Sequence, residues 1–166
     1  MTKNIACYSC ELMERRLAGN APPWDDIYRG EFWCVVHSYN SALLGWLVLI
    51  PYRHIEAIDE LNEAEAIELG KLLQRTSLVL KQTTGCLKTY VMQFAEHKEH
   101  PHVHFHVVAR MSDQPEERKG TKIFGYATPV PEERVSDLQM NELALQIRTW
   151  LNVDDQRQPY ENNVDD

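Results

Sequence analysis

Hydrophobic residues along the chain form several patterns that are typical of β-strands. Residues 31–37 are rich in β-branched and aromatic side chains, and residues 43–50 are nearly all apolar, as expected of a buried strand. A polar segment at residues 38–41 predicts a hairpin between them. Residues 87–94 and 102–109 predict two further strands.

The clearest helical pattern covers residues 62–84. Apolar side chains recur there three or four positions apart and give the segment one hydrophobic face. Asn62 and Glu65 have the spacing of a capping box at the start, and Gly85 suits a left-handed residue after the last turn. We therefore expect one long helix that packs on the sheet.

A second helix is predicted near the carboxyl end, after an irregular segment at residues 111–133. Ser136 and Gln139 have capping-box spacing at its start. The apolar face of this helix is predicted to consist of Leu143, Ile147, Trp150 and Leu151. Strands joined by hairpins, with a long helix across them, predict an α+β domain with a mainly antiparallel sheet.

Composition limits the class of protein. A chain of 166 residues with 43% hydrophobic residues can form one domain with a core. The formal net charge of −8 argues against a nucleic-acid partner, because phosphate-backbone binding needs clustered Lys and Arg. The chain has neither the apolar run of a signal peptide nor the roughly 20 apolar residues of a membrane span. We therefore expect a cytoplasmic protein with no membrane partner, whose four cysteines are reduced thiols or metal ligands.

Histidines are concentrated in one predicted strand. Four of the seven lie at even positions between 100 and 106. Alternate side chains of a strand share a face, so we expect His102, His104 and His106 on one face while Val103 and Phe105 pack into the core. Imidazole changes protonation near neutral pH, and two histidines on one strand can also bind a zinc ion. The residues alone leave open both a metal site and acid–base or nucleophilic chemistry.

The segment from His102 to Val108 resembles the histidine-triad (HIT) family, whose motif is His-φ-His-φ-His-φ-φ with φ apolar. A second resemblance lies at residues 47–55, where an apolar strand ends at Pro51 and a His-Ile pair follows at His54 and Ile55. The order of the long helix and the last strands also corresponds. The resemblance implies a HIT-like fold.

An earlier reading frame of the motif also exists. His100-Pro101-His102-Val103-His104 resembles the galactose-1-phosphate uridylyltransferase branch of the same superfamily. We favour the later frame, because only it places apolar residues at every φ position.

The resemblance covers residues 5–110 and suggests a division of the chain. We expect a HIT domain at residues 1–110, an extension with a loop and a helix at 111–152, and a disordered tail at 153–166. The family resemblance further implies a homodimer.

The resemblance also implies a two-step reaction. The central histidine, His104, would attack the α-phosphate of a nucleotide derivative, and water or another acceptor would then cleave the nucleotidyl-histidine. A backbone carbonyl would hold its other ring nitrogen. His106, Gln93 and His102 would contact the phosphate. The implied substrate is a small nucleotide derivative, either a dinucleoside polyphosphate or a nucleoside phosphoramidate.

Cys7 and Cys10 have the spacing of a zinc knuckle, which supplies two of four ligands. Some bacterial triad proteins and the uridylyltransferases have similar cysteines. The resemblance of this chain to those proteins implies that His54 and His102 complete a structural zinc site with Cys7 and Cys10.

Three positions depart from the family pattern. Trp46 follows Gly45 where the family usually has a histidine, Ser38 aligns with a ribose-binding aspartate, and Glu99 aligns with a Ser or Thr that helps the leaving group. These departures keep two other functions open. One is a catalytically weak nucleotide- or zinc-binding protein on the same fold, and the other is an enzyme that acts on a non-nucleotide phosphate.

Basic residues gather in the irregular segment after the histidines. Arg118 and Lys122 precede Phe124 and Tyr126. The segment is either a solvated connector or a substrate loop, in which the cations meet phosphates and an aromatic ring stacks on a base.

Overall fold

The structure, a computed structural model, describes residues 7–127 and 129–156. Its centre is a five-stranded antiparallel sheet with the order β1-β2-β3-β5-β4. The strands are β1 (Tyr28–Arg29), β2 (Trp33–His37), β3 (Trp46–Pro51), β4 (Lys88–Gln93) and β5 (Phe105–Arg110). This architecture confirms the predicted α+β class with a mainly antiparallel sheet.

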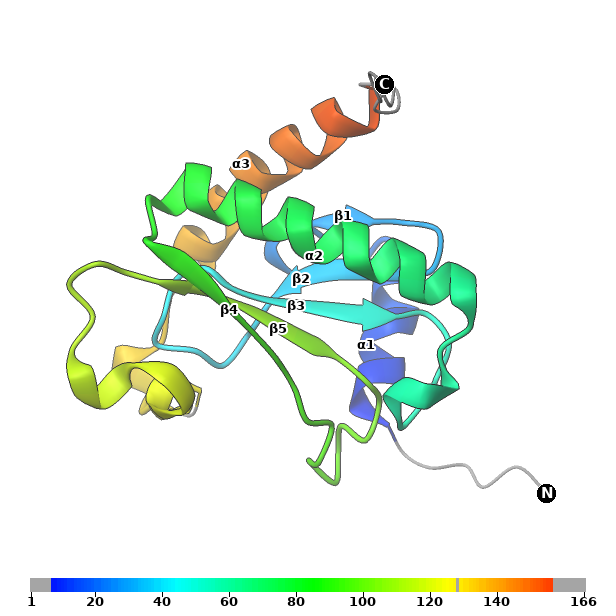
Figure 1. The fold of residues 1–166 in the computed structure, drawn as a ribbon, viewed down its shortest axis with the longest axis horizontal. Coiled ribbons are helices and arrows are strands. Elements are labelled where there is room, and N and C mark those ends of the chain that lie inside the picture. Colours follow the sequence, from blue (N-terminus) through cyan, green and yellow to red (C-terminus); the bar gives the residue numbers. More distant parts are fainter. Residues whose placement is uncertain (1–6, 128, 157–166) are drawn as a thin grey trace, which may run out of the picture.

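Helices cover both faces of the sheet (Figure 1). Helix α2 (Glu63–Thr84) crosses one face and packs beside α3 (Asp137–Gln156), whereas α1 (Tyr8–Leu17) lies against the opposite face. The described part of the chain also contains the short 3-10 helices η1 (Pro23–Asp25), η2 (Ile58–Glu60), η3 (Glu116–Arg118), η4 (Gly120–Tyr126) and η5 (Pro131–Glu133).

Strand β3 is buried on both faces, which explains its uninterrupted run of apolar residues. Leu47 and Leu49 belong to the hydrophobic cluster under α2. Trp46, Val48 and Ile50 belong to the cluster on the opposite face. A strand in the middle of a sheet that is covered on both sides has no solvent-facing positions, so the period-two alternation disappears.

Helix α2 begins and ends as the sequence predicts. The Asn62 side chain accepts a hydrogen bond from the Glu65 amide at 2.9 Å, and the Glu65 carboxylate accepts one from the Asn62 amide at 2.9 Å. Gly85 follows in the left-handed region with φ 68°. The capping box and the glycine therefore satisfy backbone groups at both helix ends.

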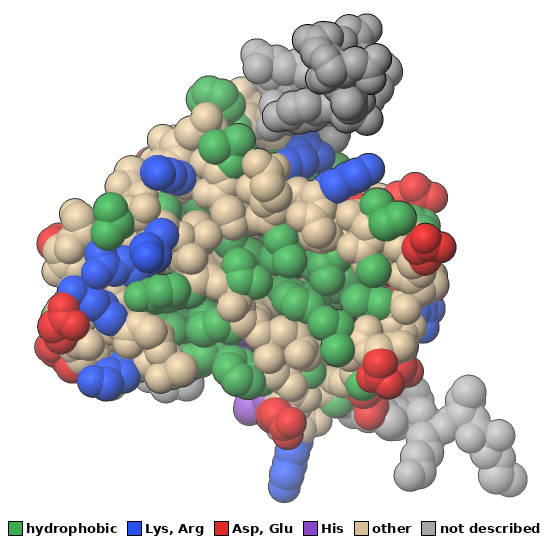
Figure 2. All heavy atoms as spheres, viewed as in Figure 1, with side chains coloured by type: hydrophobic (Ala, Val, Ile, Leu, Met, Phe, Trp, Pro, Cys, Tyr) green, Lys and Arg blue, Asp and Glu red, His purple; other side chains and the backbone are tan. Residues whose placement is uncertain are grey.

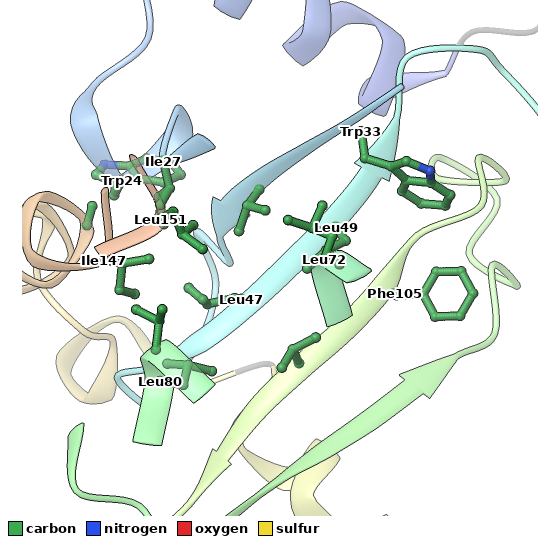
Figure 3. Close-up of a cluster of buried hydrophobic side chains, with 14 of the residues drawn as sticks. Trp24, Ile27, Trp33, Leu47, Leu49, Leu72, Leu80, Phe105, Ile147 and Leu151 are labelled. Carbon is green, nitrogen blue, oxygen red and sulfur yellow. The ribbon is translucent and has the colours of Figure 1, made fainter. Parts of the chain in front are cut away.

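The main core lies between the sheet, α2 and α3. Figure 3 shows Leu47 and Leu49 of β3, Leu72 of α2, and Ile147 of α3 within it. Leu143, Ile147 and Leu151 are buried as predicted. The prediction that Trp150 belongs to this apolar face is wrong, because its side chain is 45% exposed. Met140 and Ala144 pack in the core instead.

The histidine segment keeps its predicted alternation although the strand is shorter than predicted. Ladder pairing begins only at Phe105, so His102 and His104 precede β5. Val103, Phe105 and Val107 all enter the core under α2. The apolar residues therefore direct the intervening histidines away from α2.

Two helices also differ from the sequence predictions. Helix α1 was not expected, because its only adjacent apolar pair, Leu12 and Met13, is surrounded by charged residues. Helix α3 continues to Gln156, beyond the predicted start of a disordered tail at 153. Residues 157–166, which make up the rest of the predicted tail, lie outside the described residues.

No helix within residues 7–127 and 129–156 has the length and apolar character needed to cross a membrane.

His37 is buried at the hairpin between β2 and β3. Its Nδ1–H donates to the Ser38 carbonyl oxygen at 2.8 Å, and its Nε2 accepts from the Gly45 amide at 3.1 Å. Burial lowers the pKa of His37 to about 4. The neutral imidazole therefore joins the two strands by one donated and one accepted hydrogen bond.

Because His37 is buried in its neutral form, we expect the fold to become less stable as the pH falls. Histidine in the unfolded chain has a pKa of about 6.5, so the unfolded state takes up this proton first as the pH falls. His37 alone should therefore lower the free energy of unfolding by about 2 kcal/mol between pH 7 and pH 5. Urea denaturation of the wild type and of His37→Gln at both pH values measures the contribution. If the free energy of unfolding fell equally in the wild type and in His37→Gln, this contribution of His37 would be contradicted.

Candidate functional site

A cavity of about 170 Å³ lies between α1 and the sheet. His104 and His106 form part of its lining together with His97 and His100. The apolar walls consist of Leu12 of α1, Val36 of β2, and Val48 and Ile50 of β3. We refer to it as the inner cavity.

A backbone hydrogen bond determines which nitrogen of His104 carries the proton. His104 Nδ1 lies 2.8 Å from the carbonyl oxygen of His102. A carbonyl only accepts, so Nδ1 must be the protonated nitrogen, and the lone pair of the neutral ring lies on Nε2. Burial lowers the pKa of His104, which keeps the imidazole neutral at neutral pH. The ring is therefore prepared to act as a nucleophile through Nε2.

His106 has the opposite arrangement. The indole Nε1–H of Trp46 donates to His106 Nδ1 at 3.0 Å. Because indole nitrogen is only a donor, Nδ1 must be unprotonated and the neutral ring carries its proton on Nε2. Burial and the neighbouring His104 lower the pKa of His106 to about 3. The two rings lie 4.8 Å apart between centroids, so a free lone pair and an N–H donor stand side by side.

A second cavity opens on the other side of the same histidines. It is more exposed to solvent than the inner cavity, and we call it the outer cavity. Its lining consists of Phe94, Ala95, Glu96, His97, His104, His106 and Phe124. The residues common to both cavities are His97, His104 and His106. His104 therefore borders both cavities.

The predicted metal ligands come together at the amino end of α1. One nitrogen or sulfur atom from each of Cys7, Cys10, His54 and His102 lies within 4.8 Å of the others. Cys10 Sγ is 3.3 Å from His54 Nδ1 and 3.5 Å from His102 Nδ1. These four side chains could hold a metal ion.

The chemistry of this donor set fits zinc. Two thiols and two imidazoles are a common tetrahedral zinc set. His102 Nε2 lies 3.0 Å from the Pro51 carbonyl and must donate to it, so Nδ1 keeps the lone pair that a metal needs. Burial, with His54 nearby, lowers the pKa of His102 to about 4, so the ring is neutral. Without a metal, burial and Cys7 raise the pKa of Cys10 to about 11.

His102 and Gln93 were both predicted to contact the phosphate, and the structure brings neither to the cavities. His102 is fully buried among the metal-ligand candidates. Gln93 pairs with Phe105, whose side chain packs under α2, and paired residues of antiparallel strands point to the same face. Met92 is the residue that pairs with His106.

The predicted substrate loop reaches the site through an aromatic side chain rather than through its cations. The Phe124 ring lies 5.6 Å from Trp46 and 5.9 Å from His106, measured between centroids. The Arg118 guanidinium instead covers the Tyr126 ring at 4.8 Å, and Lys122 is exposed. Neither cation is part of the lining of the two cavities.

Sequence reasoning missed the contribution of α1. Arg16 is buried in the wall of the inner cavity, where its Nη2 donates to Asp25 Oδ1 at 2.6 Å. Its Nη1 has no hydrogen-bond partner in the part of the chain that the structure describes. The positive charge of Arg16 could have indicated a ligand-binding residue, but without a predicted helix nothing in the sequence placed it near the histidines.

A comparison with known protein families gives one match. A sequence model described as the HIT domain matches residues 23–113. No curated protein sequence matches the chain.

Solved structures with the same fold are distant in sequence. A hypothetical histidine triad nucleotide-binding protein from Sulfolobus tokodaii is 18% identical, with a TM-score of 0.65 over 89% of this chain and 93% of that chain. A Zn-bound histidine triad family protein from Mycobacterium smegmatis is also 18% identical, with a TM-score of 0.61 over 92% and 98%. A diadenosine triphosphate hydrolase from Plasmodium falciparum is 16% identical, with a TM-score of 0.57 over 76% of each chain.

These structures share the α+β HIT-like fold that the sequence predicts, and the HIT domain match spans more than half of the 166 residues. The chain belongs to the HIT domain family.

Proposed function

We propose that the chain is a nucleotidyl hydrolase or transferase that cleaves a nucleotide derivative at its α-phosphate through a nucleotidyl-histidine at His104. The observation that carries this proposal is the hydrogen bond from His104 Nδ1–H to the His102 carbonyl, because it leaves the Nε2 lone pair free on a residue that lines both cavities. Membership of a family that includes nucleotide hydrolases supports it.

In the first step, His104 Nε2 attacks the α-phosphorus and forms a P–N bond. The bond from phosphorus to the leaving group breaks, and the leaving atom keeps the electron pair and takes up a proton. In the second step, water or another acceptor adds to phosphorus and loses a proton, while the P–N bond breaks and returns neutral His104.

His106 serves this reaction as a hydrogen-bond donor. Its Nε2–H is available because Trp46 occupies Nδ1. Charge gathers on the non-bridging oxygens of phosphorus during attack, and a preorganised donor stabilises that charge. Trp46 thus takes a positioning role at the site where the family usually has a histidine.

The inner cavity suits the nucleoside. Its apolar walls, Val36 and Val48 among them, can enclose a base, and the unpartnered Arg16 Nη1 offers a donor to an acceptor atom of the ligand. A buried donor without a partner is unfavourable, so a ligand that accepts from it gains affinity.

Structural zinc is the proposed occupant of the Cys7, Cys10, His54 and His102 cluster. When bound, zinc would supply a crosslink between α1 and the segments that carry His54 and His102. The Zn-bound mycobacterial relative, which has the same fold, supports this assignment. His102 would then hold two roles, since its carbonyl also orients His104.

A homodimer is proposed for the exposed face of α2 and β4. Figure 2 shows hydrophobic side chains gathered across the middle of this face. Ile67 and Leu78 of α2, with Leu87 and Val91 near and on β4, are large exposed apolar residues. Strand β4 is also an edge strand of the described sheet, with backbone groups free for pairing. Continuation of the sheet across a two-fold axis would cover both the exposed apolar side chains and the free backbone groups of β4.

His104→Ala should abolish both turnover and the covalent adduct, with a loss of kcat on the order of a thousandfold or more, because the nucleophile is removed. His104→Asn, which keeps a similar size, should behave in the same way. Mass spectrometry of protein incubated with a panel of adenylylated and uridylylated compounds measures the adduct. An adduct that persists in His104→Ala, or that maps to His102, would show that the earlier motif frame is the functional one.

Protein purified without chelator should contain about one zinc ion per chain by elemental analysis, since the four candidate ligands form a closed set. Removal of the metal should lower the melting temperature, because α1 loses its attachment. Cys10→Ser should lose the metal, whereas Cys86→Ala, outside the cluster, should keep it. A metal-free protein whose melting temperature is insensitive to chelator refutes the site.

Light scattering at micromolar concentration should report twice the chain mass of 19.3 kDa. Val91→Lys places a charge on the apolar edge and should give monomers. Leu138→Lys changes a comparably exposed residue of α3 and should remain dimeric. A wild-type particle of one chain mass rules out the dimer.

A further inference from the structure

A buried ion pair forms part of the wall of the inner cavity. Arg16 of α1 and Asp25 of η1 both line it, and they are only 2% and 1% exposed. Arg16 Nη2 and Nε donate to Asp25 Oδ1 at 2.6 and 3.1 Å, and Nε also donates to the Asp25 carbonyl oxygen at 2.9 Å. Arg15 donates to Asp25 Oδ2. Because a buried ion pair adds little to stability by itself, its place in a cavity wall points to a role toward a ligand.

The hydrogen bonds of this pair leave donors and an acceptor free. Arg16 Nη1 is buried, and its two N–H groups have no partner in residues 7–127 and 129–156. Such a group is unfavourable until an acceptor reaches it. A carboxylate offers about four lone-pair sites, and Arg15 Nη2, Arg16 Nε and Arg16 Nη2 use three of those on Asp25. This part of the lining therefore presents N–H donors beside one remaining acceptor site.

Helix α1 places this pair at a distance from the histidines. Ser9, Leu12 and Arg16 are three and four positions apart, so they share one face of α1, and all three line the inner cavity. Ser9 Oγ lies 3.1 Å from His100 Nδ1, and burial, with His104 nearby, lowers the pKa of His100. The helix rises about 10 Å from Ser9 to Arg16. A nucleoside 5′-phosphate has about this extent, so a base can reach Arg16 while its phosphate lies at the histidines.

The surroundings of Arg16 favour a neutral ring over a second phosphate. Asp25 neutralises the guanidinium, and an anion that approached Arg16 would also meet this carboxylate. Val36, Val48 and Ile50 give the cavity apolar walls that suit the faces of a flat ring. A heteroaromatic ring with hydrogen-bonding groups along one edge satisfies both the walls and the ion pair.

We propose that Arg16 and Asp25 select the base of the bound nucleotide, and that they accept a base whose edge carries a carbonyl oxygen next to an N–H group. Arg16 Nη1 donates to the carbonyl oxygen, and Asp25 accepts from the N–H. Guanine, hypoxanthine and uracil present this edge. Adenine and cytosine present an amino group next to an unprotonated ring nitrogen, so a donor would face a donor and an acceptor would face an acceptor. The inference rests on the proposed function, and it names the substrates as derivatives of oxo-base nucleotides.

The selecting cation belongs to α1, which lies outside residues 23–113 that match the HIT domain. The histidines of the proposed reaction lie inside the matched residues. Base selection by Arg16 is therefore a property that α1 adds to the matched domain.

The test compares inosine 5′-monophosphate with adenosine 5′-monophosphate, and uridine 5′-monophosphate with cytidine 5′-monophosphate. The members of each pair have the same ring size and the same phosphate, so they differ only along the base edge. Isothermal titration of the full chain measures each Kd. In whichever ring size binds, the oxo nucleotide should have a Kd at least about tenfold lower, in line with about 1.4 kcal/mol per tenfold. Equal Kd values within both pairs would overturn the assignment.

Two matched variants assign the preference to Arg16. Arg16→Gln should reduce the ratio of the two Kd values to within about twofold, because a neutral amide offers both a donor and an acceptor. Arg15→Gln makes the same change at a residue whose side chain is 41% exposed, which contacts Asp25 but does not line the cavity, and it should keep the preference. A ratio that is unchanged in Arg16→Gln would overturn the assignment. The wild-type ratio remains a test on its own if Arg16→Gln fails to fold.

Covalent labelling at His104 separates this inference from the function on which it rests. The 5′-phosphoramidates of inosine and adenosine serve as labelling reagents, and inosine should label faster. Equal labelling by both would overturn base selection and leave the proposed function standing. Preferential binding of the oxo nucleotides without any adduct would remove the proposed reaction and leave base selection standing. Neither binding nor labelling by any of these compounds would remove both.

Discussion

The hydrogen bond from His104 Nδ1–H to the carbonyl oxygen of His102 is the interaction on which the site depends. It is one of two hydrogen bonds that share His102, because the His102 side chain donates from Nε2 to the carbonyl oxygen of Pro51 at the end of β3. His102 is fully buried and lies against Cys10, so its backbone position is held from both sides. The central strand thus fixes His104, the proposed nucleophile, through one intermediate residue, and the candidate metal-ligand cluster contacts the same intermediate residue.

Trp46 completes this arrangement from the opposite side. In place of a residue that can donate or accept, the chain has an indole that only donates, and His106 is left with its proton on Nε2. The two neighbouring imidazoles are therefore complementary, one with a free lone pair and one with an N–H donor. Burial keeps both neutral. Trp46, which departs from the family pattern in the sequence, is compatible with phosphate chemistry for this physical reason.

The sequence was sufficient for the features that depend on local periodicity. The capping box at Asn62, the alternation of Val103, Phe105 and Val107, and the buried strand β3 follow from spacing alone, and the structure confirms them. The metal-ligand set required the family resemblance, since residues 7, 10, 54 and 102 are far apart in the chain. Their proximity depends on where α1 docks.

The remaining parts of the site depend on contacts that no local pattern encodes. Helix α1 has too few apolar residues to be recognised, so Leu12 and Arg16 could not be assigned to the inner cavity. The side chain of Gln93 points to the α2 face because of its pairing register with Phe105, which only the assembled sheet determines. Phe124 reaches His106 from a segment of short 3-10 helices without helical or strand periodicity.

Two cavities of different character share the histidines in their linings. The inner cavity is bounded by α1 and has apolar walls, whereas the outer cavity is more open and is lined by Phe94, Glu96 and Phe124. The opposite tautomers of His104 and His106 are the central claim of this account, because the proposed reaction needs a free lone pair on one ring and an N–H donor on the other. Long-range proton–nitrogen NMR correlations of 15N-labelled protein at pH 7 measure them directly. The account predicts a neutral His104 with its proton on Nδ1 and a neutral His106 with its proton on Nε2. A proton on His104 Nε2, or on His106 Nδ1, would contradict it.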